Sequence, residues 1–338
     1  MTVDAVAGLR ANHQDLALVL EGVTDDEWLA DSACAGWRVK DVLAHITSNF
    51  KEIVDPTPPS DDRSSSDLTA EQAMDALVAL RRDWSVNQLL DEYEQHRDGA
   101  FAVMEALQDE PLASTPRDLA DLGTYPMHML ANALCFDHYC HLRHDLLAPA
   151  GVLTTELPQA DEVRIRPGVH WMWAGLPQMC SSVLTMLDRP VGVSLTGPGG
   201  GTWVLQPAGD DGLISVQEGG GDTAAKVTSS AHDFIAWGTQ RSDWRASCSI
   251  DGDADYAAGV LDAIDIVCDP GDVVIFSNML YHRGLPNATD EIRWSCDWRY
   301  QDAGQSTMRS ERGHIARSRR APETAVSSSA QWASLSFQ

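Results

Sequence analysis

The sequence is poor in basic residues, with 24 Lys and Arg against 50 Asp and Glu and a formal net charge of −26. Before the extreme C-terminus it has no run of basic residues long enough to follow a phosphate backbone. We therefore expect no nucleic acid among its partners.

Long apolar runs are missing as well. No stretch approaches the roughly 18 to 20 consecutive apolar residues that a membrane-spanning helix needs. The first residues, Met-Thr-Val-Asp-Ala-Val, lack the basic region and the apolar region of a secretion signal. We therefore expect a soluble cytoplasmic protein without a membrane partner.

The cysteines lack the spacing of a structural framework. Seven are present, and no two of them form a C-x-x-C pair. An odd set without this spacing favours neither a disulfide framework nor a structural zinc knuckle. We expect buried, reduced thiols.

The sequence does contain enough apolar residues, 43% of 338, for two or three hydrophobic cores. Residues 1–150 carry apolar positions at three- and four-residue spacing, and capping boxes that begin at Thr24, Thr69 and Ser85 mark helix starts. We interpret residues 1–150 as a bundle of four main helices. The helical pattern covers residues 4–21, 39–53, 69–107 and 125–147.

The pattern changes near residue 152, where glycine-rich turns such as 197–201 begin to separate short β-type runs. These runs lie at 191–195, 202–205 and 213–216, and helical patterns return at 231–237 and 256–266. We predict a small α+β domain over residues 152–268, with helices packed on an antiparallel sheet.

Histidines and a carboxylate cluster on the last helix of the predicted bundle. Asp137 and His141 are four residues apart, so a helix directs both side chains to one side. His45 lies beside the apolar face of the helix over 39–53. If these faces pack together, His45, Asp137 and His141 suit Zn²⁺ or another divalent metal, with one coordination position left open. His138 is the alternative to Asp137 as the third ligand.

A lone histidine near an apolar face is more often a hydrogen-bonded core residue than a metal ligand. The last helix, however, carries four histidines in a short span, and buried imidazoles need hydrogen-bond partners. The cluster therefore favours a metal site. We expect His128 and His144 to face solvent or to support the ligands.

The run Gly36-Trp-Arg-Val-Lys-Asp-Val-Leu-Ala-His45, followed later by Asp137-x-x-x-His141, resembles the DinB-like N-terminal domain of mycothiol-dependent maleylpyruvate isomerases and their relatives. In that family a histidine on the second helix and a Glu-x-x-x-His on the last helix bind the metal. The resemblance thus implies His45, Asp137 and His141 as ligands. The chain departs from the family in carrying Asp137, one methylene shorter than glutamate, which leaves His138 as the alternative.

Residues 155–268 resemble the sterol-carrier-like C-terminal domain attached to such bundles, through Gly197-Pro-Gly-Gly-Gly-Thr-Trp203 and Trp237-Gly-Thr-Gln-Arg241. The resemblance over residues 1–268 implies a metal that holds mycothiol, or a similar low-molecular-weight thiol, as a thiolate. It implies isomerisation of, or thiol transfer to, a small organic substrate, by a monomer or a homodimer. The alternative from another class is a non-catalytic module that binds a metal or an apolar ligand.

Residues 269–338 resemble the closing part of the phytanoyl-CoA dioxygenase family, through Asp269-Pro-Gly-Asp-Val-Val-Ile-Phe276 and His282-Arg-Gly-Leu-Pro-Asn287. By this resemblance His282 would bind Fe(II), and Arg293 would hold the carboxylate of 2-oxoglutarate. The sequence offers no His-x-Asp on a strand to complete the iron site, since His13-Gln-Asp15 and His96-Arg-Asp98 lie in segments that are predicted to be helical. We interpret the segment as a partial jelly-roll domain with a loosely held tail, joined by fusion or by gene-model error, and oxygenase activity is the least favoured alternative.

Overall fold

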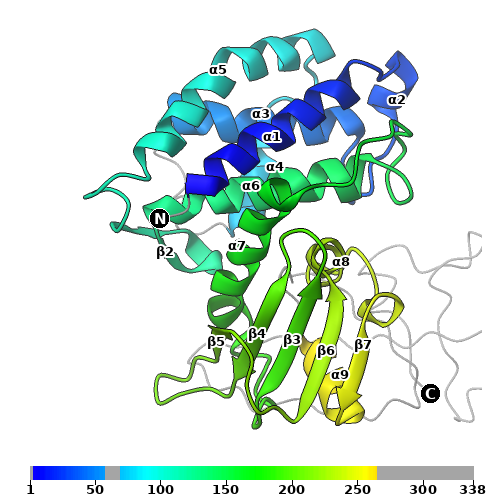
Figure 1. Cartoon of the computed structure of the whole chain (residues 1–338). Helices are drawn as coiled ribbons and strands as arrows, with labels where there is room; N and C mark the ends of the chain where they lie inside the picture. Colours follow the sequence, from blue (N-terminus) through cyan, green and yellow to red (C-terminus); the bar gives the residue numbers. More distant parts are fainter. Residues whose placement is uncertain (1–2, 58–68, 265–338) are drawn as a thin grey trace, which may run out of the picture. The chain divides into compact units, whose positions relative to one another are not determined.

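The computed structural model describes residues 3–57 and 69–264, which fall in one compact unit of helices and a five-stranded sheet (Figure 1). The segment 269–338, with His282 and Arg293, lies outside the described residues. The expectations for an iron site therefore stay predictions.

Four long helices form the N-terminal bundle, as the periodicity predicts: α1 (Val3–Leu20), α3 (Val39–Val54), α5 (Val86–Ala106) and α6 (Leu130–Cys140). Two shorter helices, α2 (Asp25–Leu29) and α4 (Ala70–Ala79), come between them in the chain. α3 packs on α4 and α5, and α1 packs on α5 and α6. The three predicted capping boxes are confirmed, with Thr24, Thr69 and Ser85 as N-caps.

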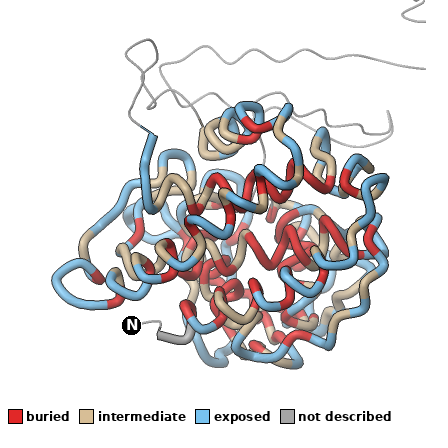
Figure 2. The backbone as a smooth tube through the Cα atoms, turned by 90° about the horizontal axis from the view of Figure 1, so that it is seen from above, coloured by how far each residue is buried: buried red, intermediate tan, exposed pale blue. Residues whose placement is uncertain are grey.

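Buried positions recur along the helices between exposed ones (Figure 2). On α3 the side chains of Val42, Leu43, Ile46 and Phe50 are each 1% exposed or less. Their spacing marks one face of a helix, and burial of each such side chain contributes about 1.5–3 kcal/mol. This buried face fixes which other side chains of α3 point into the bundle, and His45 is one of them.

The last bundle helix is shorter and less regular than the helix predicted over 125–147. Pro116–Asp118 (β1) and Thr124–Pro126 (β2) pair as an antiparallel hairpin, so no helix begins at Tyr125. A 3₁₀ turn, η3 (Met127–Met129), leads into α6, and a π-helix, η4 (His141–Leu146), continues it. π-helical turns are rare and are frequent at functional sites.

A long helix that the sequence analysis did not predict, α7 (Glu162–Cys180), follows the bundle. Pro167 and Pro177 lie inside it and interrupt the pattern by which helices are predicted. Pro167 has no N–H to bond the carbonyl oxygen of Val163, and Gly8 of α1 comes close to this carbonyl. α7 contacts α1, α6 and α8 (Ala231–Trp237), so it links the bundle to the rest of the unit.

The strands after α7 form one sheet in the order β5-β4-β3-β6-β7. The prediction of an antiparallel sheet is wrong for one pair, because β3 and β6 run in parallel with Val193 opposite Val227. β4 and β5 lie on one side of β3, so the chain crosses to the other side before β6 begins. The elements span Val191–Thr196 (β3), Gly201–Gln206 (β4), Ser215–Glu218 (β5), Ala225–Ser230 (β6), Trp244–Ala246 (η5), Ser249–Gly252 (β7) and Ala254–Ala263 (α9).

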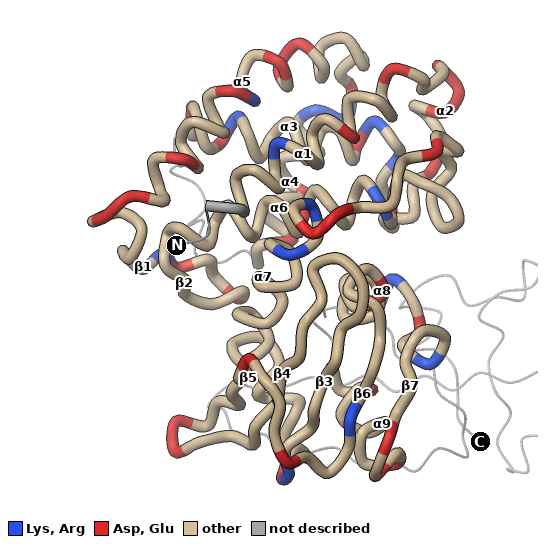
Figure 3. The backbone as a smooth tube through the Cα atoms, viewed as in Figure 1, with Lys and Arg blue, Asp and Glu red and all other residues tan. Residues whose placement is uncertain are grey.

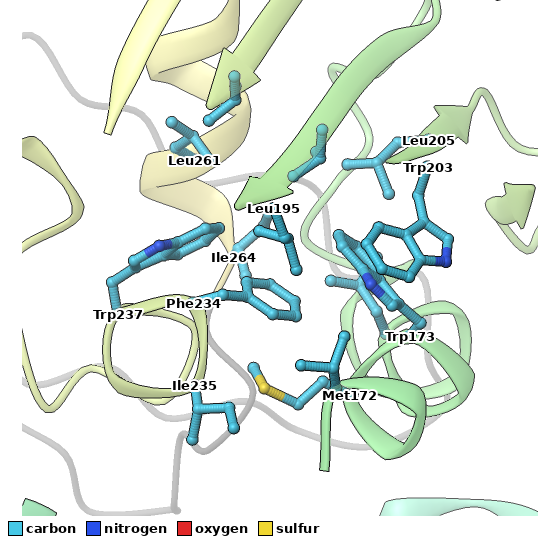
Figure 4. Close-up of a cluster of buried hydrophobic side chains, with 14 of the residues drawn as sticks. Met172, Trp173, Leu195, Trp203, Leu205, Phe234, Ile235, Trp237, Leu261 and Ile264 are labelled. Atoms are coloured by element: carbon cyan, nitrogen blue, oxygen red, sulfur yellow. The ribbon is translucent and has the colours of Figure 1, made fainter. Parts of the chain in front are cut away.

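A second hydrophobic core joins this sheet to its helices, and Figure 4 labels Trp173, Trp203, Phe234 and Trp237 among its members. The ring of Trp173 on α7 stacks on Phe234 of α8 at 4.5 Å between centroids, and Phe234 meets Trp237 edge to face at 5.0 Å. Such aromatic pairs add about 0.5–1.5 kcal/mol beyond the burial of their area. The core thus anchors α8 and the loop after it, which carries Arg241.

Acidic residues are spread along the bundle helices, for example on α2 and α5 (Figure 3). The first turn of α2 contains Asp25, Asp26 and Glu27, and negative charge is favourable at a helix N-terminus. Within 3–57 and 69–264, no helix combines the length and the apolar character that crossing a bilayer requires.

Candidate metal site

The structure brings His45 of α3, Asp137 of α6 and His141 of η4 together. His45 Nε2 lies 2.8 Å from Asp137 Oδ2, and His141 Nε2 lies 3.5 Å from Asp137 Oδ1. One possible ligand atom from each of the three residues lies within 4.8 Å of the other two. The imidazole rings of His45 and His141 are 4.8 Å apart between centroids.

The cluster has a buried side and an open side. The side chain of His45 is 4% exposed and that of His141 is 7% exposed, whereas that of Asp137 is 32% exposed. The Asp137 carboxylate is therefore the most solvent-exposed of the three side chains.

A second carboxylate orients His141. His141 Nδ1 donates a hydrogen bond of 2.8 Å to Asp145 Oδ2, which is 3% exposed. Arg241, from the loop after α8, donates two hydrogen bonds of 2.9 Å to the same carboxylate. This fork is the rigid, two-point geometry that arginine makes with carboxylates. A histidine whose outer N–H is held by a carboxylate is typical of metal-binding sites.

The charges of the cluster favour a cation between the carboxylates. Burial alone would raise the pKa of Asp137, but the imidazoles of His45 and His141 hold it well below its usual range. Burial alone would lower the pKa of His141, but Asp137 and Asp145 raise it to about 9. The pKa of Asp145 falls to about 2, because hydrogen bonds from His141 and Arg241 outweigh its burial. A proton on His141 or a metal ion would each supply the positive charge.

His138, the alternative ligand, approaches the same carboxylate from another side. His138 Nε2 lies 3.6 Å from Asp137 Oδ2, and burial lowers the pKa of this histidine to about 3. Asn49 lies between the two, with Nδ2 at 3.2 Å from Asp137 Oδ2 and 3.4 Å from His138 Nε2. Because His45, Asp137 and His141 approach one another most closely, the geometry favours them over a set that includes His138.

Trp37 and Cys34 lie beside the imidazoles. The Trp37 ring stacks on His141 at 5.8 Å and lies 5.1 Å from the His45 ring. Cys34 forms a second group with His141 and Asp145, again with ligand atoms within 4.8 Å. Burial, reinforced by the charge of Asp145, raises the pKa of the Cys34 thiol to about 12. The described cysteines are free, as predicted, and most are buried: Cys135, Cys140 and Cys180.

The other two histidines of the last helical segment lie away from the cluster. His128 Nδ1 bonds the carbonyl oxygen of Ala113 at 2.8 Å. His144 stacks on His232 of α8 at 4.6 Å between ring centroids. Both are half-buried, so neither faces solvent fully.

Three residues around the cluster were not predicted from the sequence: Asn49, Asp145 and Arg241. Asn49 follows His45 by four residues and Asp145 follows His141 by four, a spacing that puts side chains on one side of a helix. That spacing was the available signal for both. Arg241 lies in a distant segment, and no local pattern connects it with the cluster.

The donor set fits a divalent ion such as Zn²⁺. Two ligand atoms, nitrogen or oxygen, that each lie about 2.0–2.1 Å from a tetrahedral ion are roughly 3.4 Å apart. The atom pairs of the cluster, at 2.8 and 3.5 Å, bracket this separation. Asn49 Nδ2, a hydrogen-bond donor, already points at the carboxylate that such an ion would engage. Three protein ligands with one open side are typical of catalytic zinc sites.

Solved structures give distant matches. The crystal structure of the mycothiol-dependent maleylpyruvate isomerase is 12% identical and matches with a TM-score of 0.46, over 73% of this chain and 91% of that chain. A sterol carrier protein domain of Helicoverpa armigera is 14% identical, with a TM-score of 0.24 over 32% of this chain and 90% of that one. Sterol carrier protein 2 of Yarrowia lipolytica is 17% identical, with a TM-score of 0.23 over 32% and 96%. At these values the matches carry no argument about chemistry.

No curated protein matches the chain. Residues 9–146, however, match the family model described as the mycothiol maleylpyruvate isomerase N-terminal domain. The matched range contains His45, Asp137, His141 and Asp145, whereas Arg241 lies beyond it. Most of the bundle that carries the candidate site thus matches this family model.

Proposed function

We propose that this chain is a divalent-metal-dependent enzyme that uses mycothiol, or a similar low-molecular-weight thiol, to isomerise a small organic substrate or to transfer a thiol to it. The observation that carries the proposal is the convergence of His45, Asp137 and His141 with one side of the carboxylate open. The family domain over residues 9–146 supports the thiol and the reaction class. In this proposal residues 1–150 are the metal-binding bundle and 152–268 the supporting α+β domain.

Each residue has a distinct task. His45, Asp137 and His141 would hold the ion, Zn²⁺ being the best match to two imidazoles and one carboxylate. Asp145 keeps the hydrogen of His141 on Nδ1, so Nε2 of His141 is directed at the ion. A bound ion of this kind lowers the pKa of a coordinated thiol, which makes the sulfur nucleophilic at neutral pH.

Metal analysis tests the site. Purified full-length protein is expected to hold about one zinc ion per chain, and the His45→Ala variant to hold none, because one of three ligands is lost. His96→Ala is the matched control, since His96 is also buried but bonds the backbone oxygen of Glu92, away from the cluster. Equal zinc content in the wild type and His45→Ala would contradict the assignment.

Turnover tests the reaction class. The zinc-loaded chain, mixed with mycothiol and maleylpyruvate as the first substrate, is expected to isomerise it only when the thiol is present. The His45→Ala variant is the inactive control. The protein could hold one zinc ion per chain and still convert no substrate that carries an activated double bond or a leaving group when the thiol is present. That result would indicate a metal-binding module without catalysis.

A further inference from the structure

The ring of Trp37 contacts both imidazoles of the candidate metal site. Its centroid lies 5.1 Å from that of His45, with the ring planes tilted by 42°, and 5.8 Å from that of His141, with the planes stacked at 29°. His45 belongs to α3 and His141 to η4. One half-buried side chain, from the loop between α2 and α3, therefore packs on rings of two separate elements.

The loop between α2 and α3 fixes the place of Trp37. The backbone N–H of Trp37 donates to the carbonyl oxygen of Cys34 at 3.1 Å and closes a turn. Gly36 lies in this turn with a φ of 79°, a conformation that favours glycine. Ala33 N donates to the backbone oxygen of Asp145 at 3.0 Å, so the loop is attached to the π-helix η4.

A hydrogen bond from α4 holds the indole of Trp37. Trp37 Nε1 donates to Asp75 Oδ1 at 3.0 Å. The Asp75 side chain is 63% exposed, and Arg82 Nη2 lies 3.9 Å from the same oxygen. A rotation of the indole ring would break the bond to Asp75, because the indole has a single N–H donor. Asp75 thus selects one orientation of the ring.

The two imidazoles differ in how far they depend on this packing. His141 Nδ1 is held by Asp145 at 2.8 Å, whereas His45 Nδ1 is buried and has no hydrogen-bond partner in the described structure. The bond of His45 to Asp137 is made by Nε2, the atom that would bind the ion. A hydrogen bond at the second ring nitrogen usually orients a metal-binding histidine. At His45, packing takes over this task, and Trp37 is a neighbouring ring that is itself held in place.

We propose that Trp37 is a positioning residue that holds the His45 and His141 rings in the arrangement that binds a divalent ion, and that Asp75 fixes Trp37 from α4. The role toward the ion rests on the proposed function. The packing of the three rings does not depend on a metal, and the effect on His45 exceeds that on His141.

NMR of the metal-free, full-length protein tests the packing. In the wild type we expect nuclear Overhauser contacts between the rings of His45 and His141, which lie 4.8 Å apart between centroids. In Trp37→Leu these contacts are expected to be lost, because the His45 ring is free to turn. Trp84→Leu is the matched control, since Trp84 also packs against the core of the bundle but its ring contacts Arg81. Unchanged contacts between His45 and His141 in Trp37→Leu overturn the inference.

The arrangement of a bound ion tests the role at the site. Co²⁺ in place of Zn²⁺ gives visible absorption bands that depend on how the ligands are arranged. Trp37→Leu is expected to bind zinc about tenfold more weakly and to change the cobalt bands, whereas Trp84→Leu is expected to match the wild type in both. Wild-type cobalt bands and zinc affinity in Trp37→Leu overturn the role. A wild type that binds neither ion overturns the proposed function, and the NMR experiment still decides whether Trp37 holds the rings.

Two substitutions of Asp75 separate its hydrogen bond from its charge. Asp75→Asn keeps an oxygen that accepts from Trp37 Nε1, and it is expected to bind zinc like the wild type. Asp75→Ala removes the acceptor and is expected to weaken zinc binding about threefold, which is within the range for one hydrogen bond. Equal zinc affinities of the two variants would overturn the part of the proposal that concerns Asp75.

Discussion

The three histidines around Asp137 differ in the hydrogen-bond partner of Nδ1, the ring nitrogen that does not face Asp137. His141 Nδ1 donates to Asp145, and His138 Nδ1 bonds His13, whereas His45 Nδ1 is buried and has no hydrogen-bond partner in the described structure. Outer partners set the tautomer and the basicity of an imidazole. The carboxylate partner therefore marks His141 as the most firmly oriented of the three rings.

The Asp145→Asn substitution is expected to weaken zinc binding by about 10- to 100-fold, because the amide no longer supplies a charged acceptor for His141 Nδ1. Competition with a coloured zinc chelator measures the affinity. Asp262→Asn is the control, since Asp262 also accepts hydrogen bonds from an arginine, Arg245, but lies exposed. An Asp145→Asn variant with wild-type affinity would argue that Asp145 has only a structural role.

Histidine burial also predicts a pH dependence of stability. Burial, together with the charges of the neighbouring His232, Arg241 and Arg143, lowers the pKa of His144 to about 3 against the opposing effect of Asp145. In the unfolded chain the pKa returns to about 6.5. As the pH falls below 6.5, the unfolded state takes up a proton that the folded state does not, so the free energy of unfolding decreases.

Urea unfolding at pH 7.5 and at pH 5.0 measures this decrease. In His144→Phe, which keeps an aromatic ring against His232, the decrease is expected to be smaller than in the wild type by at most about 2 kcal/mol. Equal decreases in both proteins would show that His144 is not neutral in the folded state.

Among the elements, those with clear local signals could be predicted from the sequence. α1, α3 and α8 have apolar periodicity, and α2, α4 and α5 begin at capping boxes, so their positions match the predictions closely. α7 was not predicted, because Pro167 and Pro177 interrupt its helical pattern. The π-helix η4 was not predicted either, because no residue pattern distinguishes it from a continuing α-helix.

The approach of α1 to α7 yields a prediction at this scale. A Cβ atom on Gly8 would lie 2.4 Å from the carbonyl oxygen of Val163, so Gly8→Ala is expected to destabilise the fold by about 1–3 kcal/mol. Gly259→Ala in α9 meets nothing within 4 Å and is expected to stabilise by up to about 1 kcal/mol. Thermal or urea unfolding compares the two, and similar effects of the two substitutions would contradict the close contact of α1 and α7.

For the molecule as a whole, the α+β part contributes to the site of the bundle. Asp145 is 3% exposed on its side chain and is paired with Arg241, which comes from beyond the matched family domain. The sequence predicted Asp137 and His141 as candidate ligands because their four-residue spacing is local, and His45 because it lies beside the apolar face of its helix. It could not predict the arginine, because the Asp145–Arg241 contact joins segments that only tertiary packing brings together.

Removing this arginine tests the coupling. Arg241→Met leaves the buried Asp145 carboxylate without its arginine partner and is expected to destabilise the fold by about 3–5 kcal/mol and to weaken zinc binding. Arg245→Met breaks an exposed pair and is expected to cost about 1 kcal/mol or less. Equal losses of unfolding free energy in the two variants would indicate that Asp145 is solvated after all.

The most direct measurement is anomalous diffraction at the zinc edge from crystals of the full-length protein grown with Zn²⁺. The account predicts one strong peak within bonding distance of His45 Nε2, His141 Nε2 and a carboxylate oxygen of Asp137, with a position left open for a further ligand. A peak bound to other residues, or no peak at saturating zinc, would contradict it.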